Sequence, residues 1–398
     1  LFAIITGAVG GIIGGSFSRL IALGASLRAE HKWLIFLLPV IGVLIVLLYK
    51  VTGEEKNKGT NMVLSSISEK GEVSLPTGPL IFVSTVLSHL GGASVGREGA
   101  ALQLGGWLGT VFAKLIRLDE NKKKIATMCG MAAVFAALFG TPVAAAVFSI
   151  EVISVGVFYY AALVPCIVSA FTGSWIAQNI MGAAQEGWKI AFVPEVNPAN
   201  LALSLLLGIL CAALAILLVV TLHKTEHYVK KFLVNPYIRA LVCGAVIAGA
   251  TLLIGTQKYT SSGVVLIDEA LAGNVDYPAF LIKLAFTAVA IAGGFRGGEI
   301  VPTLSIGAAF GAAFGAITGF PVSLSAACGM IALFAGATNC PIASMLIAME
   351  MFGGEGLPFF AITVVLSFSL SGYYSLYGAQ RFAYSKTKTE YIDRKSNE

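Results

Sequence analysis

The sequence predicts an all-α polytopic membrane protein made of two similar halves. Its 398 residues are 57% hydrophobic and only 12% charged, with a mean hydropathy of +0.85, whereas soluble domains carry about 25% charged residues. Many apolar segments are long enough to cross a bilayer, and glycine or proline often interrupts them. Similar motifs also recur in the same order in the two halves of the chain. Together these features indicate broken transmembrane helices arranged as two repeats.

Glycine content, charge and cysteine usage narrow the class further. The 45 glycines exceed the usual share of about 7%, which suits close helix packing and helix breaks. The net charge is +5, but the basic residues are dispersed among short loops, so they indicate cytoplasmic loops and no nucleic-acid partner. The six cysteines lie singly in apolar segments and are predicted to be small packing residues that bind no metal.

The first half contains seven predicted apolar helices. A basic stretch at 114–124 separates two of them and is expected on the cytoplasmic side by the positive-inside rule. The segment at 52–76 is polar and is interpreted either as a solvated loop or as the start of an anion-binding helix. The predicted helices are Leu1–Gly24, Trp33–Val51, Leu80–Leu90, Ala100–Ile116, Ala126–Gly140, Pro142–Ser154 and Val157–Met181.

The second half begins after the polar stretch at 182–200, which is the best domain boundary in the chain. The sequence therefore predicts a first repeat at 1–182, a linker at 183–198, a second repeat at 199–383 and a short cytoplasmic tail at 384–398. The predicted helices are Leu201–Leu222, Ile238–Ile254, Ala279–Gly294, Thr303–Ile317, Pro341–Phe352 and Leu357–Tyr374.

Two independent motif pairs indicate an internal duplication. A Phe-Ala pair precedes Pro142, which is followed nine residues later by Glu151, and the same pattern leads to Pro341 and Glu350. The second pair joins Gly96–Gly99 to Gly298–Pro302, each followed by two similarly spaced glycines. Because both pairs occur in the same order and at nearly the same offset, chance is a poor explanation. Broken helices at matching positions of two repeats predict a transport site where these motifs meet.

The segment Gly96-Arg97-Glu98-Gly99 places two charges between glycines inside long apolar sequence. Charge at membrane depth is costly and usually functional. Flanking glycines allow a helix to start there with free backbone N–H groups, which bind anions. We therefore predict that Glu98 is a movable acid at an anion site. The alternative, a buried Glu98 paired with Arg97, is disfavoured because adjacent helical residues do not face each other.

These motifs resemble the CLC family of anion channels and proton-coupled antiporters. The segment Gly96–Gly99 is similar to the family's Gly-Lys/Arg-Glu-Gly-Pro signature, with Ala100 in place of proline. Gly298–Pro302 resembles its Gly-x-Phe-x-Pro signature, and Tyr384 its C-terminal tyrosine. The resemblance implies a CLC-type fold of inverted repeats and a homodimer with one pathway per subunit. It also implies that Glu98 gates the site, occupying it when ionised and carrying the proton when protonated.

Three departures from chloride-handling members modify this expectation. Gly59-Thr60-Asn61-Met62-Val63 stands where those members have Gly-Ser-Gly-Ile-Pro, and Glu299-Ile300 stands in the second signature. Both features resemble the fluoride-exporting branch of the family. Chloride/proton antiporters also carry paired acids after the Pro-led helix, but here Glu151 is followed by Val152. The missing acid argues against a chloride antiporter of the usual kind.

The predicted anion-binding set combines both loops with a tyrosine. Fluoride is strongly hydrated, so its site needs short, strong donors, and backbone N–H groups, Asn61 and Thr60 can supply them. The hydroxyl of Tyr384 is a further candidate, with Tyr377 as its alternative. Met62 either packs or contacts the anion. The full set is Gly96, Arg97, Gly99, Thr60, Asn61, Met62, Glu299, Ile300, Val301 and Tyr384.

The other acids have simpler interpretations. Glu299 is either an acid stabilised by the dipole at a helix start or a participant in proton transfer. Glu151 and Glu350 are expected to make structural ion pairs or bonds to backbone. His223 and His227 have a spacing that could bind zinc, but no third ligand is evident, so a solvated helix face is favoured.

We therefore predict a proton-coupled fluoride exporter in the plasma membrane, most simply a bacterial inner membrane. Its expected partners are fluoride, protons, the bilayer and a second copy of the chain. The alternatives are a chloride or nitrate antiporter and a passive anion channel. A hydrolytic enzyme is not expected, because the sequence has neither a His-Glu-x-x-His motif nor a Ser/His/Asp set at membrane depth, and no cofactor is expected.

Overall fold

The computed structural model is α-helical with one small sheet, and it describes residues 1–69, 71, 73–184 and 187–397. Residues 185–186 of the predicted linker lie outside the described residues. The first-half elements are α1 (Phe2–Glu30), the 3-10 helix η1 (Lys32–Leu37), α2 (Leu38–Val51), α3 (Thr60–Ser68), α4 (Thr77–Gly91), α5 (Glu98–Leu115), α6 (Glu120–Phe139), α7 (Pro142–Glu151), β1 (Ser154–Val155) and α8 (Tyr160–Asn179).

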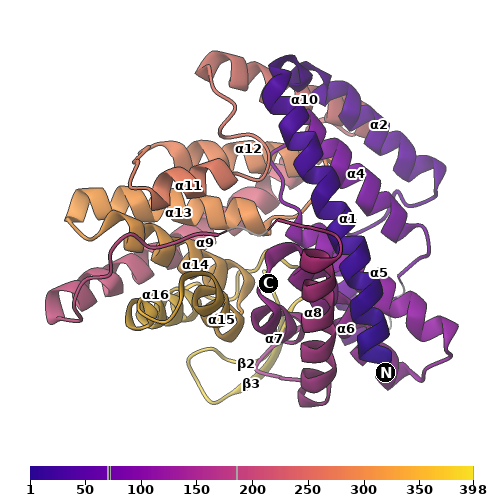
Figure 1. The fold of residues 1–398 in the computed structure, drawn as a ribbon. Helices are drawn as coiled ribbons and strands as arrows, with labels where there is room; N and C mark the ends of the chain where they lie inside the picture. Colours follow the sequence, from indigo (N-terminus) through magenta and orange to yellow (C-terminus); the bar gives the residue numbers. More distant parts are fainter. Residues whose placement is uncertain (70, 72, 185–186, 398) are drawn as a thin grey trace.

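The second half repeats this order of helices. Its elements are α9 (Pro198–Phe232), α10 (Pro236–Ile254), α11 (Val264–Leu271), α12 (Ala279–Gly293), α13 (Ile300–Thr318), α14 (Val322–Thr338), α15 (Pro341–Phe352), α16 (Leu357–Leu370), β2 (Arg381–Tyr384) and β3 (Tyr391–Lys395). In both sets the third helix is short, and the fifth helix begins at one of the glycine-rich motifs. Figure 1 shows the second-half helices α11, α13, α14 and α16 on one side of the molecule and α1, α5, α6 and α8 on the other.

Six helices of the described chain are long and apolar enough to cross a membrane. They are Phe2–Glu30, Lys32–Val51 (η1 with α2), Tyr160–Asn179, Pro198–Phe232, Pro236–Ile254 and Ile300–Thr318. Several carry exposed apolar side chains, such as Phe171 and Trp175 on α8. Apolar side chains that face outward from a helix bundle suit contact with lipid or with another membrane-embedded surface.

Three helices differ from the sequence-based expectation. The segment after Gly59 is a helix, α3, so the polar stretch contains a helix start at Thr60 and is not a loop throughout. Helix α11 lies within a stretch expected to be polar loop, and α14 lies between two predicted helices. Both α3 and α11 begin after a glycine with positive φ, Gly59 and Gly263, a conformation that glycine adopts without strain.

Glycine allows the same close helix crossing in both halves. A Cβ on Gly130 of α6 would lie 2.0 Å from the Gly105 carbonyl oxygen of α5. A Cβ on Gly329 of α14 would likewise lie 2.4 Å from the Gly307 carbonyl oxygen of α13. Backbones in direct contact pack more tightly than larger side chains would permit. These crossings hold the helices that begin at the two motifs.

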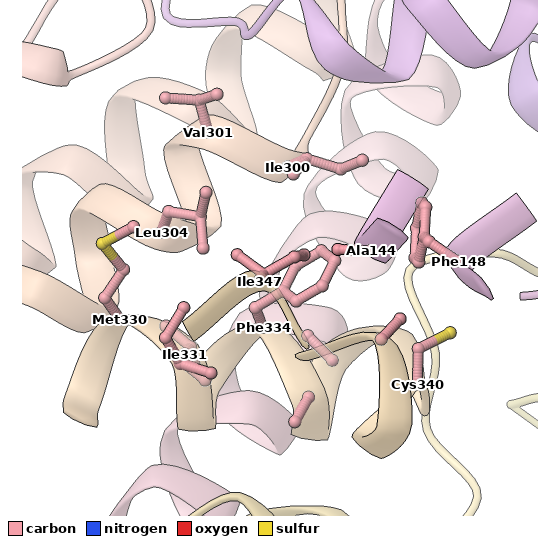
Figure 2. Close-up of a cluster of buried hydrophobic side chains, with 14 of the residues drawn as sticks. Ala144, Phe148, Ile300, Val301, Leu304, Met330, Ile331, Phe334, Cys340 and Ile347 are labelled. Atoms are coloured by element: carbon pink, nitrogen blue, oxygen red, sulfur yellow. The ribbon is translucent and has the colours of Figure 1, made fainter. Parts of the chain in front are cut away.

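The two halves share one apolar core where α7, α13, α14 and α15 converge (Figure 2). Phe148 of α7 packs against Phe334 of α14, with ring centroids 5.4 Å apart. The aromatic contact continues to Phe135 of α6 at 5.2 Å. Among the described residues all six cysteines are buried and free, which agrees with the predicted packing role. This core joins one half of the chain to the other.

Helices α7 and α15 cap each other's amino termini across the two halves. The carboxylate of Glu151 accepts hydrogen bonds from the Ile342 and Ala343 amides, at 3.1 and 2.7 Å. The carboxylate of Glu350 accepts from the Val143 and Ala144 amides in the same way, at 3.0 and 2.8 Å. Each carboxylate satisfies N–H groups that a helix start leaves unpaired. The predicted bond from these acids to backbone is confirmed.

A three-stranded sheet ties the chain's end to its first half. Strand β2 pairs in parallel with β1 and antiparallel with β3. The β2–β3 hairpin lies at the lower edge of the molecule in Figure 1. The expected division between the second repeat and the tail at 383/384 falls inside β2.

Candidate anion site

The two glycine-rich motifs meet and pair through their backbones. The Gly96 amide donates to the Gly298 carbonyl at 2.6 Å, and the Gly298 amide donates to the Gly96 carbonyl at 2.7 Å. A Cβ on Gly298 would lie 2.3 Å from the Gly99 nitrogen, so this contact requires glycine. The sequence-based expectation that the two broken helices come together is therefore met by direct hydrogen bonds.

Two helix starts converge at this junction. Within α5 the first intrahelical bond runs from Ala101 to the Arg97 carbonyl, and within α13 from Thr303 to the Glu299 carbonyl. The amides that precede these donors have no acceptor within their own helix. Such N–H groups, together with the helix dipole, favour an anion. The backbone of Gly99, Ile300 and Val301 can therefore contribute to anion binding.

Glu98 is fully buried and held by its neighbour. Its side chain is 1% exposed, and one carboxylate oxygen accepts from the Arg97 Nε at 3.1 Å. The other oxygen accepts from the Arg97 backbone amide, also at 3.1 Å. The expectation that these two residues do not pair is wrong, because Arg97 is the residue before the helix and the spacing rule for helical neighbours does not apply to it.

The Arg97 guanidinium also anchors the motif to other helices. It donates to the Ser18 hydroxyl of α1 at 3.4 Å and to the Leu138 carbonyl of α6 at 3.5 Å. Glu98 thus lies as a carboxylate at a helix start, beside a fixed cation. This is a position in which an exchangeable anion would also be stabilised.

A polar cavity of about 660 Å³ lies on one side of the junction. It is lined by the start of α3, the end of α9, the connection between α12 and α13, and the segment 376–379. Thr60, Asn61 and Glu299 all line this cavity, so the structure brings these predicted site residues together. Charged side chains of both signs also line it, among them Arg296, Lys230 and Glu226.

Thr60 and Asn61 are both engaged by the protein. The Thr60 hydroxyl donates to the Gly99 carbonyl at 3.3 Å and accepts from the Gln103 amide at 3.3 Å. The Asn61 carbonyl oxygen accepts from the Ala379 backbone amide at 3.0 Å, and its NH₂ group is available as a donor. Gln103 also lines the cavity, and sequence reasoning missed it because it lies within an apolar helix.

The tyrosine at the cavity is Tyr377. Its side chain is 1% exposed, it lines the cavity, and its hydroxyl has no hydrogen-bond partner among the described residues. The predicted Tyr384 instead lies in β2, is 47% exposed and packs edge-on against Tyr391. The placement of Tyr384 at the site is therefore wrong, since strand β2 carries it outward.

The remaining predicted residues lie beside the cavity. Met62 is partly buried and packs against the main core. The side chains of Ile300 and Val301 are buried in that core, as Figure 2 shows. Only the backbone of these two residues can face an anion.

Lys283 is a second residue that sequence reasoning missed. It is fully buried in α12 and donates to the Ser94 hydroxyl, the Tyr259 carbonyl and the Ser261 carbonyl, at 2.9, 3.2 and 2.6 Å. Three acceptors match the three donors of an ammonium group. Ser94 precedes the Gly96 motif, so Lys283 attaches that segment to the second half. The sequence feature that could have identified Lys283 is that it is a single lysine inside an apolar run.

No group of three or more potential metal ligands occurs among the described residues. His223 and Glu226 line the cavity, and Glu226 pairs with Lys230.

The two halves bring matched broken helices together at a buried junction, where their backbones pair. A polar cavity with free hydrogen-bond donors lies beside this junction. These features define a membrane protein that conducts or transports anions. Residues 41–372 match the family described as voltage gated chloride channel. The chain belongs to this family, the CLC family.

Relatives within the family cover nearly the whole chain. A chloride/fluoride channel protein of Pseudomonas syringae pv. tomato is 34% identical over 386 residues, covering 94% of this chain and 85% of the relative. The crystal structure of a CLC-type fluoride/proton antiporter superposes with a TM-score of 0.92 at 30% identity, covering 96% and 97% of the two chains. A slow cyanobacterial Cl⁻/H⁺ antiporter has the same fold, with a TM-score of 0.81, 17% identity and 93% coverage of each chain.

Proposed function

We propose that this protein exports fluoride in exchange for protons, as a homodimer in a bacterial inner membrane. The observation that carries the proposal is the Glu98 carboxylate, which lies at the start of α5 beside Arg97. A carboxylate and fluoride are both hard, strongly hydrated anions and compete for the same donors. When Glu98 is protonated it loses its attraction to these donors, and fluoride can replace it.

The residues around the junction are assigned complementary roles. Backbone amides at the starts of α5 and α13 bind the anion, and the Tyr377 hydroxyl and Asn61 amide donate to it from the cavity side. Glu299 faces the cavity without an ion-pair partner among the described residues and is positioned to exchange protons with water there. Val152 cannot pass a proton, so Glu299 takes the place of the second acid.

Similarity to a fluoride/proton antiporter and to a chloride/fluoride channel protein supports fluoride as the substrate. The bacterial relative supports a bacterial inner membrane. Exposed apolar side chains on α8 and α15, including Phe171 and Ile342, offer a surface for a second copy within the bilayer.

The test uses purified protein in liposomes loaded with fluoride or with chloride. An outward anion gradient is imposed and internal pH is followed. We expect proton uptake driven by fluoride and little driven by chloride. Equal proton uptake with both anions would overturn the selectivity for fluoride, and anion efflux without proton uptake would indicate a passive channel.

A further inference from the structure

The segment that carries Tyr377 has no regular secondary structure of its own. It runs from the end of α16 to β2, and the Tyr377 backbone amide bonds only to the nearby Ser375 hydroxyl, at 3.1 Å. A segment without a helical or strand ladder depends on bonds to neighbouring parts of the chain. The position of the Tyr377 hydroxyl is therefore set by whatever holds residues 373–380.

The last described residues of the chain supply many of these bonds. The Ser396 hydroxyl donates to the Tyr377 carbonyl at 2.8 Å, and the Ser396 amide donates to the Gln380 carbonyl at 3.1 Å. The Asn397 side chain accepts from the Ser375 amide and donates to the Ser375 carbonyl, both at 3.0 Å. The Asn397 amide donates to the Tyr373 carbonyl at 3.0 Å. Two residues thus bond the segment at four positions.

Besides the pairing of β2 with β1, two side-chain contacts anchor the β2–β3 hairpin that delivers Ser396 and Asn397. The Lys386 ammonium donates to the Phe368 carbonyl and the Ser371 hydroxyl at the end of α16, at 2.9 and 3.0 Å. Lys395 pairs with Glu69 after α3, at 3.2 Å, and lines the cavity. The hairpin therefore connects the end of α16 to the segment after α3, which lies beside the cavity.

Gln380 also holds the segment 373–380, through bonds to parts of the chain other than the tail. It is fully buried, its amide donates to the Val152 and Thr338 carbonyls, and its oxygen accepts from Asn339 and Ser375. All four hydrogen-bonding positions of this side chain are used. Gln380 attaches the segment to the ends of α7 and α14, while Ser396 and Asn397 close it from the tail.

We propose that Ser396 and Asn397 form a clamp, the tail clamp, that positions Tyr377 at the cavity end of the anion site. The effect of this clamp on transport rests on the proposed exchange of fluoride for protons. A tightly held Tyr377 keeps the cavity end of the site narrow, so that an anion leaves only when Glu98 has exchanged its proton. Loosening the clamp should let anions pass without a proton. The charged tail is thus a determinant of coupling.

The test compares Ser396→Ala with Ser396→Thr in the full chain. Alanine removes the bond to the Tyr377 carbonyl and threonine keeps a hydroxyl there. Loss of one such bond should speed amide hydrogen exchange in residues 375–380 about fivefold, and the number of fluoride ions moved per proton should rise. The threonine variant should match the parent in both. Lys388→Ala, at an exposed turn where the side chain makes no bond among the described residues, is the matched control.

Each outcome decides the proposal. Unchanged hydrogen exchange in Ser396→Ala would overturn it, as would faster exchange with an unchanged fluoride-to-proton ratio. Equal effects of alanine and threonine would show a packing defect and also overturn it. If the parent itself exchanges no fluoride for protons, the proposed function fails, and the clamp is then judged by hydrogen exchange in the segment alone.

Discussion

The two motifs at the junction have similar backbones but place their acids differently. In the first half, Glu98 is buried, bonded to Arg97 and separated from bulk water. In the second half, Glu299 lines the cavity and has no ion-pair partner among the described residues. The nearest arginine of the second motif, Arg296, stacks on the Tyr49 ring at 4.1 Å instead of meeting the acid.

This difference shows what each copy of the duplicated motif contributes. The glycines and helix starts are kept in both halves, so both halves supply amides for an anion. The side chains differ, so one acid is held at the junction while the other faces the water-accessible cavity. Two acids in unlike surroundings suit transfer of a proton in stages. The same substitution at Glu98 and at Glu299 should therefore have different effects on transport.

The largest expected effect is that of Glu98→Gln. An amide has nearly the same shape but cannot release a proton at the junction, so fluoride-driven proton uptake into liposomes should be abolished while anion flux continues. Internal pH and fluoride efflux are measured together. Glu120→Gln, at an exposed position at the start of α6, is the control and should behave as the parent. Proton uptake against a gradient in Glu98→Gln would refute the proposed role.

Glu299→Gln should slow coupled transport without eliminating anion binding. Removing a positioned proton-transfer group lowers rates by about 10²-fold or more, and we expect a loss near the lower end because cavity water can carry protons in part. The turnover of fluoride and protons is measured in liposomes. Glu299→Asp keeps the acid and should recover part of the rate. If Glu299→Gln retained full turnover, Glu299 would be only a helix-start acid.

A smaller effect, on stability, is expected at the reciprocal caps. Glu151→Ala leaves two N–H groups of α15 unpaired at a buried position, which costs about 1–3 kcal/mol. Glu350 is more exposed, so water can replace its carboxylate and Glu350→Ala should cost less, about 0.5–1.5 kcal/mol. Unfolding in detergent is followed for both variants. Equal losses would contradict the difference in burial between the two ends.

Sequence patterns predicted what depends on backbone and periodicity. The helix starts at Pro142 and Pro341 and the meeting of Gly96 with Gly298 followed from glycine, proline and the repeat. The pairing of Glu98 with Arg97 did not, because it depends on Arg97 lying just outside the helix. A shift of one residue in the start of the helix therefore decides whether Arg97 and Glu98 can pair.

Long-range side-chain placement was the least predictable feature. Tyr384 and Tyr377 are seven residues apart in a segment without helical periodicity, and only the tertiary structure shows that Tyr377 lines the cavity while Tyr384 is exposed. The role of Lys283 was equally difficult to predict, since its three acceptors come from segments distant in sequence. Contacts of this kind are set by the tertiary arrangement and leave little local signal.

The smallest expected effect concerns the difference between the helix starts of α3 and α11. The start of α3 lies at the cavity, whereas that of α11 lies against Lys283, where a Cβ on Gly263 would come within 2.7 Å of the lysine Cε. Met62 follows Asn61 in the first turn of α3. Met62→Ser adds a hydroxyl donor and removes apolar packing there, so chloride flux in liposomes should rise by a factor of about five, equivalent to about 1 kcal/mol from one hydrogen bond. Met62→Leu keeps the apolar packing and should leave chloride flux low. A rise in chloride flux with leucine, or none with serine, would place anion selection at another part of the junction.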